Sequence, residues 1–227
     1  MFPEQPTFPN ESEAYRAARN ELLAKEQELR ALTEAVAAQR RKLPLGGEVP
    51  EDYVFEQWTN DGVPRPVPMG ELFAKGKNSL FVYSFMYGPD MKNPCPMCAS
   101  FIDGLNAQAR HLEERINLAV VARSPIERLM HFAQERGWYE LQLLSSEKNG
   151  YNAAYHAESS DGSQWPIANV FAKRDGRIHH TWASEMLFCE PLAQGLNPRH
   201  VDPFWPLWNV LDATPEGRGS DWFPSLS

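Results

Sequence analysis

The sequence has few cysteines, no excess of basic residues and no long apolar run, and each absence narrows the class of protein. No stretch of the 227 residues approaches the roughly 20 consecutive apolar residues that a membrane-spanning helix needs. Lys and Arg number 22 against 30 Asp and Glu, which gives a formal net charge of -8. A protein that binds nucleic-acid phosphates needs a basic face, so the net negative charge argues against a nucleic-acid partner. The lack of a long apolar run argues against a membrane partner.

The cysteine content and the N-terminal residues point to a reducing compartment. Residues 1–10 contain three prolines and no apolar run, so they lack the pattern of a secretory signal peptide. We therefore expect a cytoplasmic location, where structural disulfides are rare. Of the three cysteines, two are spaced C-x-x-C. In such a compartment this spacing indicates redox chemistry or a metal site rather than a structural disulfide.

Residues 11–43 predict one long helix with a narrow apolar row. The row contains Tyr15, Ala18, Leu22, Leu29, Leu32, Val36 and Leu43. Its steps of three and four residues are typical of a coiled-coil seam. We therefore predict an N-terminal helical arm over residues 1–47, followed by the main domain with a C-terminal extension over residues 48–227. We expect these apolar side chains to be buried against another surface, either the chain's own main domain or the same helix of a second copy in a homodimer.

Beyond the arm, the pattern alternates between apolar runs and amphipathic segments. We predict strands over 53–59, 80–85, 116–121, 141–144, 167–172 and 177–182, and helices from Pro96 and from Pro125. The segment 63–68 holds three prolines and is expected to be irregular extended chain. A strand–helix–strand unit followed by an antiparallel hairpin predicts an α/β domain with a mixed sheet. Its site is expected beyond the carboxyl ends of the strands.

The dithiol Cys95-Pro96-Met97-Cys98 falls at this expected position, between the buried strand and its helix. Pro96 suits the first position of a helix, where a missing N–H is harmless. Cys95 would then lie at the helix N-terminus, where free N–H groups and the helix dipole favour a thiolate. Cys98 lies one turn later on the apolar face. We therefore predict Cys95 as the attacking thiol and Cys98 as the resolving thiol.

The stretch FVYSFMYGPDMKNPCPMC resembles the active-site region of domain-of-unknown-function family 899. The later pieces NVFAKRDGRIHHTW and LDATPEGRG resemble other segments of that family. The resemblance implies a thioredoxin-like fold and a predicted dithiol-disulfide oxidoreductase, with the dithiol at Cys95 and Cys98. It implies no substrate. The sequence departs from ordinary thioredoxins, because Asn93-Pro94 precedes Cys95 and Pro-Met separates the cysteines.

Three further residues are candidates for supporting roles. By resemblance to thioredoxin-like proteins, Pro166 is the candidate for a cis-proline beside the dithiol. Asp90 and Lys92 lie in the loop before Cys95, where either could tune the thiol or assist a proton transfer. The alternative for both is an exposed loop charge.

Other sites are weighed against the dithiol. A c-type haem site needs a histidine directly after the second cysteine, where this chain has Ala99. Lys92 occupies the position where a peroxiredoxin-like site carries threonine, which disfavours peroxidase activity. A zinc site remains an alternative, with the two thiols joined by His179, His180 or Cys189.

We therefore predict a thiol-disulfide oxidoreductase that acts on a protein or a small-molecule thiol or disulfide, without a cofactor or a metal. The main alternative is a non-catalytic thioredoxin-like module that uses the same groove to bind a partner protein. A reactive Cys95 thiol of low pKa would favour the enzyme, and two inert thiols would favour the module.

Overall fold

The computed structural model describes residues 6–59, 61–189 and 199–226. The chain divides into two compact units, Met1–Pro44 and Leu45–Ser227. Gly47 already belongs to the second unit, since its carbonyl accepts a hydrogen bond of 3.0 Å from the backbone N–H of His180. No helix in the described part of the chain is long and apolar enough to cross a bilayer.

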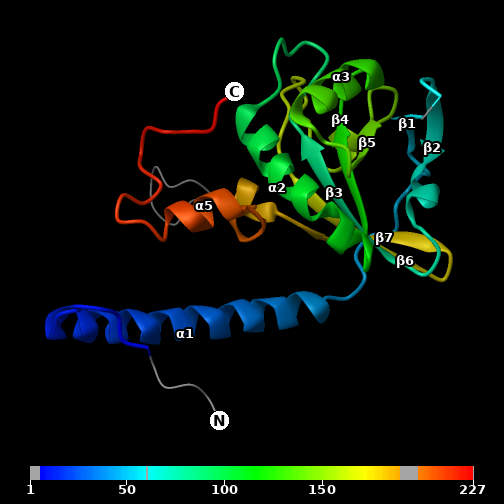
Figure 1. The fold of residues 1–227 in the computed structure, drawn as a ribbon. Coiled ribbons are helices and arrows are strands. Elements are labelled where there is room, and N and C mark those ends of the chain that lie inside the picture. The colour runs from blue at the N-terminus through cyan, green and yellow to red at the C-terminus, as the bar shows by residue number, and fades with distance from the viewer. Residues whose placement is uncertain (1–5, 60, 190–198, 227) are drawn as a thin grey trace. The chain divides into compact units, whose positions relative to one another are not determined.

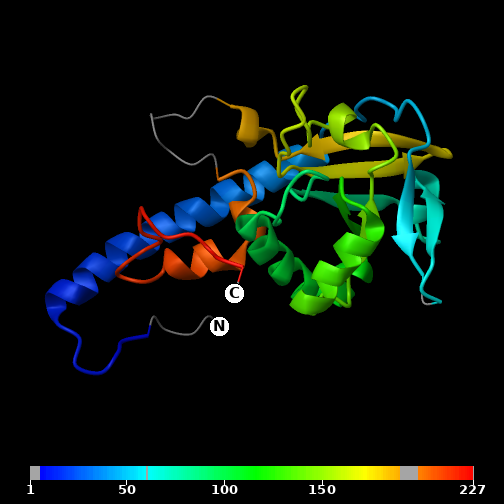
Figure 2. The ribbon, with the colours of Figure 1, turned by 90° about the horizontal axis from the view of Figure 1, so that it is seen from above.

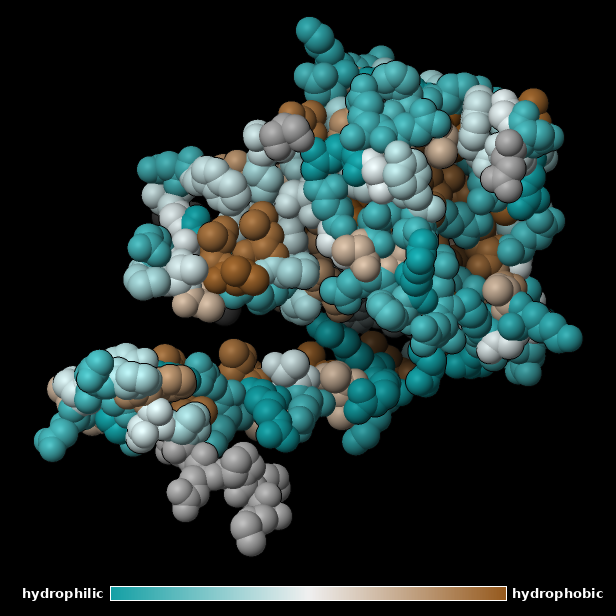
Figure 3. All heavy atoms as spheres, viewed as in Figure 1, coloured by the Kyte–Doolittle hydropathy of each residue, from teal (hydrophilic) through white to brown (hydrophobic). Residues whose placement is uncertain are grey.

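The first unit is built around α1 (Glu13–Arg41), whose N-terminus is capped by the side chain of Ser12. None of its residues is buried. The apolar row stays exposed between charged side chains (Figure 3), with exposed fractions of 51% for Leu22, 64% for Leu29 and 39% for Val36. No other part of this unit therefore packs on the apolar row. Packing of the row against the same helix of a second copy stays a prediction.

The second unit contains one mixed sheet in the order β2-β1-β5-β4-β3-β6-β7. Its strands are β1 (Val54–Trp58), β2 (Pro64–Pro68), β3 (Ser79–Phe85), β4 (Asn117–Ala122), β5 (Gln142–Ser145), β6 (Ala168–Arg174) and β7 (Arg177–Ala183). Strands β3, β4 and β5 are parallel, whereas β6 and β7 continue the sheet as an antiparallel hairpin. The hairpin turns at Asp175 and Gly176, which both have positive φ. A two-residue turn of this kind matches the twist of the strands.

The order of elements gives the second unit a thioredoxin-like fold. Strand β3 leads through α2 (Pro96–Glu113) to β4, and α3 (Ile126–Arg136) connects β4 to β5. The hairpin β6–β7 then lies on the other side of β3. The predicted α/β class, with a mixed sheet flanked by helices, is confirmed.

The sheet separates two hydrophobic cores. Figures 1 and 2 show α2 and α3 on the same face, as two consecutive crossovers of one hand require. The core on this face includes Tyr83, Phe101 and Leu129, together with Trp205 and Trp208 from the C-terminal segment. The core on the opposite face is formed around other side chains, among them Tyr53, Phe55, Tyr151 and Phe171. The short helix α4 (Tyr151–Ala154) contributes to it.

The proline-rich segment that we expected to be irregular forms β2 instead. It pairs antiparallel with β1, and it lies at the edge of the sheet. Its prolines stand at alternate positions, 64, 66 and 68. Alternate residues of a strand point their backbone N–H groups to the same side, so all three prolines can face away from β1. The lost donors then fall on the open edge, where proline is tolerated in a sheet.

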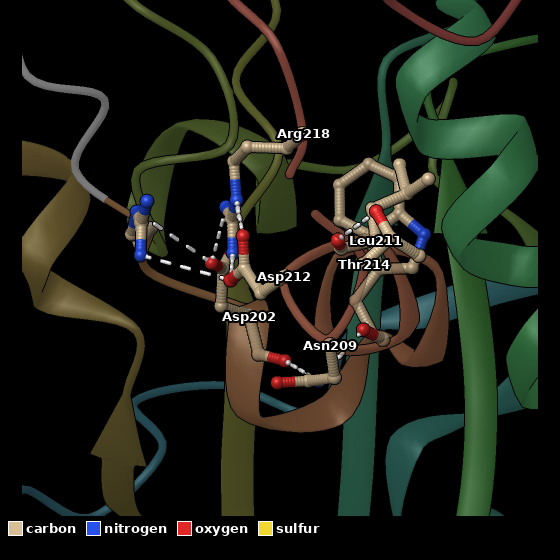
Figure 4. Close-up of polar contacts among 8 residues, drawn as sticks. Asp202, Asn209, Leu211, Asp212, Thr214 and Arg218 are labelled. Atoms are coloured by element: carbon tan, nitrogen blue, oxygen red, sulfur yellow. Dashed lines mark hydrogen bonds and ion pairs between the residues drawn. The ribbon is translucent and has the colours of Figure 1, made fainter. Parts of the chain in front are cut away.

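The C-terminal segment is held by one arginine. Arg218 donates from Nε to Oδ1 of Asp212 at 2.7 Å and from Nη1 to Oδ2 of Asp202 at 2.8 Å (Figure 4). Its guanidinium also lies 5.2 Å from the ring centroid of Trp208 on α5 (Pro206–Leu211). Trp205, directly before α5, contacts the ring of Phe101 on α2 at 5.7 Å. Arg218 therefore stabilises the segment that packs on the dithiol helix.

Replacement of Arg218 tests this role. We expect Arg218→Gln to lower the free energy of unfolding by about 1 kcal/mol, because charge-assisted hydrogen bonds are lost while solvent screens part of the charge. Arg218→Lys should lose less, since it keeps the charge but not the fork that reaches two carboxylates. Denaturant unfolding at low and high salt measures both. A Gln variant as stable as the wild type at both salt concentrations would show that the arginine does not hold the segment.

Candidate active site

The dithiol lies where β3 ends and α2 begins. Cys95 is the N-cap of α2, with φ -65° and ψ 122°, and Pro96 is the first helical residue. The backbone N–H of Cys95 donates to the carbonyl of Met86 at 3.0 Å, which holds the start of the helix against the end of β3. Cys95 is half-buried and Cys98 is buried, and both are free thiols. The sequence-based placement of the pair is thus reproduced.

The surroundings of Cys95 favour its thiolate. The pKa of Cys95 is lowered from 9.0 to about 6. The largest cause is a hydrogen bond from the Cys98 side chain, and the backbone N–H groups of Cys98 and Met97 add to it, whereas burial opposes the shift. The two N–H groups belong to the first turn of α2, where backbone donors have no partner within the helix. Cys95 is therefore a thiolate at neutral pH.

The surroundings of Cys98 favour its protonated form. Its exposed fraction is 1%, and burial raises the pKa of Cys98 well above 9.0. The hydrogen bond that it donates to Cys95 and the negative charge on Cys95 raise this pKa further. The hydroxyl of Tyr83 and the backbone N–H of Met86 act in the opposite direction, since both can donate to a Cys98 thiolate. The pair therefore consists of one thiolate and one thiol, with a donor ready for the second sulfur.

Tyr83 was not singled out from the sequence, where it is one of several aromatic residues in a buried strand. It points from β3 into the core that α2 covers, and its ring centroid is 4.5 Å from that of Phe101. Burial raises the pKa of Tyr83 well above 10.0. Its hydroxyl therefore stays protonated and remains a donor. The alternation of β3 placed this side chain on the α2 face, but only the position of α2 brings it to Cys98.

Arg128, on α3, holds the loop between β3 and Cys95. Its guanidinium donates to four backbone carbonyls of that loop, those of Gly88, Pro89, Met91 and Lys92. It also lies 4.1 Å from the ring centroid of Tyr87. Nothing in the sequence distinguished this arginine from others on helices. By fixing the loop, it fixes the backbone that precedes Cys95.

A cavity of about 540 Å³ lies beside this loop. Its lining includes Tyr87, Asn93, Pro94, Arg128 and Phe132. Asn93 and Pro94 directly precede Cys95, but neither cysteine is among the described lining residues of the cavity. Its size falls within the range of small-molecule sites.

The expectation of a cis bond at Pro166 is wrong. No cis peptide bond occurs among the described residues, so the Trp165–Pro166 bond is trans. The trans form is favoured by about 0.5–1 kcal/mol for bonds that precede proline. Hydrogen bonds hold the chain on both sides of the bond, from the N–H of Trp165 to the carbonyl of Ala157 at 2.8 Å and between His200 Nε2 and the carbonyl of Pro166 at 2.7 Å. Pro166 does precede β6, the neighbour of β3.

The other candidate residues do not converge on the dithiol. Asp90 and Lys92 are exposed, and neither is among the main causes of the pKa shift of either cysteine. The ring of His180 contacts Phe171, in the core on the opposite face of the sheet from Cys98. Cys189 is exposed. Among the described residues no three or more His, Cys, Asp or Glu side chains form a group that could hold a metal ion.

Comparison with known proteins identifies a family and several structural neighbours. No curated protein matches the chain. Among solved structures, reduced Prx3 of Vibrio vulnificus in complex with H₂O₂ is 16% identical, with a TM-score of 0.47 over 68% of this chain and 91% of that chain. AhpC of Enterococcus faecalis is 13% identical, with a TM-score of 0.47 over 79% and 98%. The reduced 2-Cys peroxiredoxin of Plasmodium vivax is 16% identical, with a TM-score of 0.48 over 74% and 96%.

The fold assignment rests on the strand order and connections described above rather than on these distant neighbours. The family assignment rests on the sequence. The model of the family described as "Bacterial protein of unknown function (DUF899)" matches residues 5–227. The chain therefore belongs to this family of bacterial proteins.

Proposed function

We propose that this protein is a thiol-disulfide oxidoreductase in which Cys95 attacks and Cys98 resolves. The observation that carries the proposal is the opposite shift of two thiol pKa values within one helical turn, down to about 6 for Cys95 and well above 9.0 for Cys98. A structural pair of cysteines has no need of such a difference. Perturbed pKa values of this kind are concentrated at functional sites.

The reaction proceeds by two exchanges between sulfur atoms. The Cys95 thiolate attacks a substrate disulfide, forms a mixed disulfide and releases the first substrate thiolate. Cys98 then loses its proton, attacks the Cys95 sulfur and releases the second substrate thiolate. The hydroxyl of Tyr83 and the N–H of Met86 stabilise the Cys98 thiolate during this step. The dithiol has given two electrons to the substrate, and the two protons of the substrate thiols come from Cys98 and from solvent.

The side chains around Cys95 favour an apolar substrate surface. Met86, Met91 and Met97 are partly buried and pack with Cys95 against the same core. Methionine is flexible and polarisable, and surfaces rich in it adapt to varied apolar partners. A protein or small molecule that presents a disulfide within an apolar surface is therefore the proposed substrate class.

Trapping of mixed disulfides tests the proposal. In Cys98→Ser the resolving thiol is absent, so Cys95 should accumulate as a mixed disulfide with 5-thio-2-nitrobenzoate when the protein meets the corresponding aryl disulfide. In the wild type the adduct should be transient, and the product should be an internal disulfide two mass units lighter than the dithiol. With Cys189, the exposed third thiol, replaced by serine in all three proteins, Cys95→Ser should trap little, because Cys98 is buried and protonated. Intact mass spectrometry of alkylated samples measures all three proteins.

Three controls separate this proposal from its alternatives. Cys189→Ser should form the internal disulfide as the wild type does and should lack only the one stable adduct that the exposed Cys189 takes up. Equal and slow reaction of Cys95 and Cys98 would instead favour a module that only binds a partner. Stoichiometric zinc in the purified protein, with the thiols protected until a chelator is added, would replace the redox proposal with a metal site.

A further inference from the structure

A second cavity, of about 790 Å³, lies on the sheet face opposite the dithiol. Its lining includes Tyr53, Tyr155, Phe188, Asn169, His180 and Glu185. Tyr53 belongs to the core on that face, and Tyr155 packs against it, whereas Cys98 belongs to the core on the other face. The sheet therefore separates this cavity from the exchange chemistry.

One wall of the cavity is closed by a segment paired with β7. The backbone N–H of Val49 donates to the carbonyl of Ile178 at 2.8 Å, and the carbonyl of Gly47 accepts from the N–H of His180 at 3.0 Å. Gly46 is required here, because a Cβ at this position would lie 2.2 Å from the carbonyl oxygen of His180. Backbone hydrogen bonds and a close approach to β7 thus hold this wall in place.

Aromatic rings form much of the cavity surface. The ring of Tyr155 lies 5.9 Å from that of Tyr53 and 5.6 Å from that of His180. A second pair is formed by His156 and Phe188, with centroids 5.8 Å apart. Burial raises the pKa of Tyr155 to about 12, so this phenol stays neutral. Such faces favour a flat ring and attract a cation.

A buried amide orients the imidazole of the wall. Asn169 is only 1% exposed, and its Oδ1 lies 2.9 Å from Nε2 of His180. Burial lowers the pKa of His180, and the neighbouring His156 lowers it further, whereas Glu185 raises it. The imidazole is therefore neutral at physiological pH, and it adds an aromatic face without a positive charge.

The charged side chains that line the cavity are carboxylates. Among the lining residues that the structure describes are Glu48 and Glu185 but no lysine or arginine. Glu48 forms an ion pair with Arg177, in which Oε2 of Glu48 lies 3.1 Å from Nη1 of Arg177. Glu185 forms no ion pair with any residue that the structure describes. One carboxylate beside uncharged aromatic rings is thus available to a ligand.

We propose that this cavity binds a small planar aromatic molecule that carries a protonated amine. Its ring packs on the wall formed by Tyr53, Tyr155 and His180, and its ammonium group pairs with Glu185. The site is separate from the dithiol and does not depend on the function proposed for it.

Three indoles of matched shape test the proposal by titration calorimetry and ligand-observed NMR. Tryptamine carries the ammonium group, 3-ethylindole is neutral, and indole-3-propionate carries a carboxylate. We expect tryptamine to bind about tenfold more tightly than 3-ethylindole, since a cation beside aromatic rings and a carboxylate gains on the order of 1.4 kcal/mol. Indole-3-propionate should bind most weakly of the three.

Two variants assign the roles of the residues. Glu185→Gln should remove the advantage of tryptamine over 3-ethylindole and leave the binding of 3-ethylindole unchanged. Tyr155→Leu should weaken both ligands. Glu216→Gln, an exposed carboxylate away from the cavity, and Cys95→Ser should bind as the wild type does. The proposal is overturned if tryptamine shows no saturable binding at millimolar concentrations, if indole-3-propionate binds as tightly, or if folded Glu185→Gln keeps the full preference.

Discussion

Cys98→Ala should make Cys95 react far more slowly at pH 6 than it does in the wild type. The hydrogen bond from Cys98 is the largest cause of the lowered pKa of Cys95. Without it the pKa should rise toward its ordinary value of 9.0, opposed only by the backbone N–H groups of Cys98 and Met97. Below the pKa, each unit of rise lowers the thiolate fraction tenfold, so the rate with iodoacetamide should fall by more than about tenfold.

Cys98→Ser provides the matched comparison. A serine hydroxyl can still donate to the Cys95 sulfur, so this variant should keep part of the lowered pKa, while alanine keeps none of this contribution. In the wild type the rate should rise with pH through a midpoint near 6 and then level off. In Cys98→Ala the midpoint should move upward. A profile that is identical in all three proteins would show that Cys98 does not control the reactivity of Cys95.

The pKa shift of Cys95 should also make the free energy of unfolding depend on pH. The folded state lowers the pKa of Cys95, so the folded protein holds the thiolate more readily than the unfolded chain does. This contribution to stability is present above the ordinary pKa of 9.0 and is lost as the pH falls through about 6. We therefore expect Cys95→Ser to remove a part of the stability that depends on pH in this window.

Phe101→Ala should cause the largest loss of stability among single substitutions near the site. Phe101 is fully buried on α2, and its ring contacts both Tyr83 at 4.5 Å and Trp205 at 5.7 Å. Loss of the ring leaves a cavity between the sheet, α2 and the C-terminal segment. Truncations of buried phenylalanine destabilise proteins by about 3–5 kcal/mol, through lost transfer free energy and the cavity.

Denaturant unfolding measures this loss in the free energy of unfolding. Two further variants serve as controls. Phe101→Leu should lose less, because it fills part of the cavity. Val210→Ala, on α5 but 65% exposed, should change the free energy of unfolding by no more than about 0.5 kcal/mol. Since Phe101 supports Tyr83, the alanine variant should also slow the resolving step. A stability equal to that of Val210→Ala would mean that the three rings do not form one core.

The dithiol and its setting could be predicted because they depend on neighbours in the sequence. The apolar run of β3, the proline after Cys95 and the apolar face of α2 lie within one continuous stretch. The pKa of Cys95 is lowered mainly by the hydrogen bond from the Cys98 side chain, three residues along the chain, and further by backbone N–H groups of the first helical turn. Arg128 and Tyr83 could not be found in this way, because their roles depend on which loop and which sulfur the fold brings to them.

Two wrong predictions have the same origin. The prolines of β2 were interpreted as irregular chain because sequence alone does not reveal which strand lies at the edge of a sheet. Pro166 was the candidate for a cis bond by resemblance to thioredoxin-like proteins, from its place before the strand expected beside the dithiol. The hydrogen bonds that hold the trans form come from Ala157 and His200, which lie at a distance along the chain.

The sequence by itself determined the fold class and the position of the dithiol at a helix N-terminus, and from this position it predicts the order of reactivity of the two thiols. These follow from apolar periodicity and from the backbone donors of a first helical turn, which are local. Only the tertiary structure decided which donors meet Cys98, which arginine holds the preceding loop, and that a second cavity lies across the sheet, lined by a carboxylate that pairs with no residue in the described part of the chain. These depend on contacts between distant segments, and their geometry is set by the packing of side chains on the two faces of one sheet.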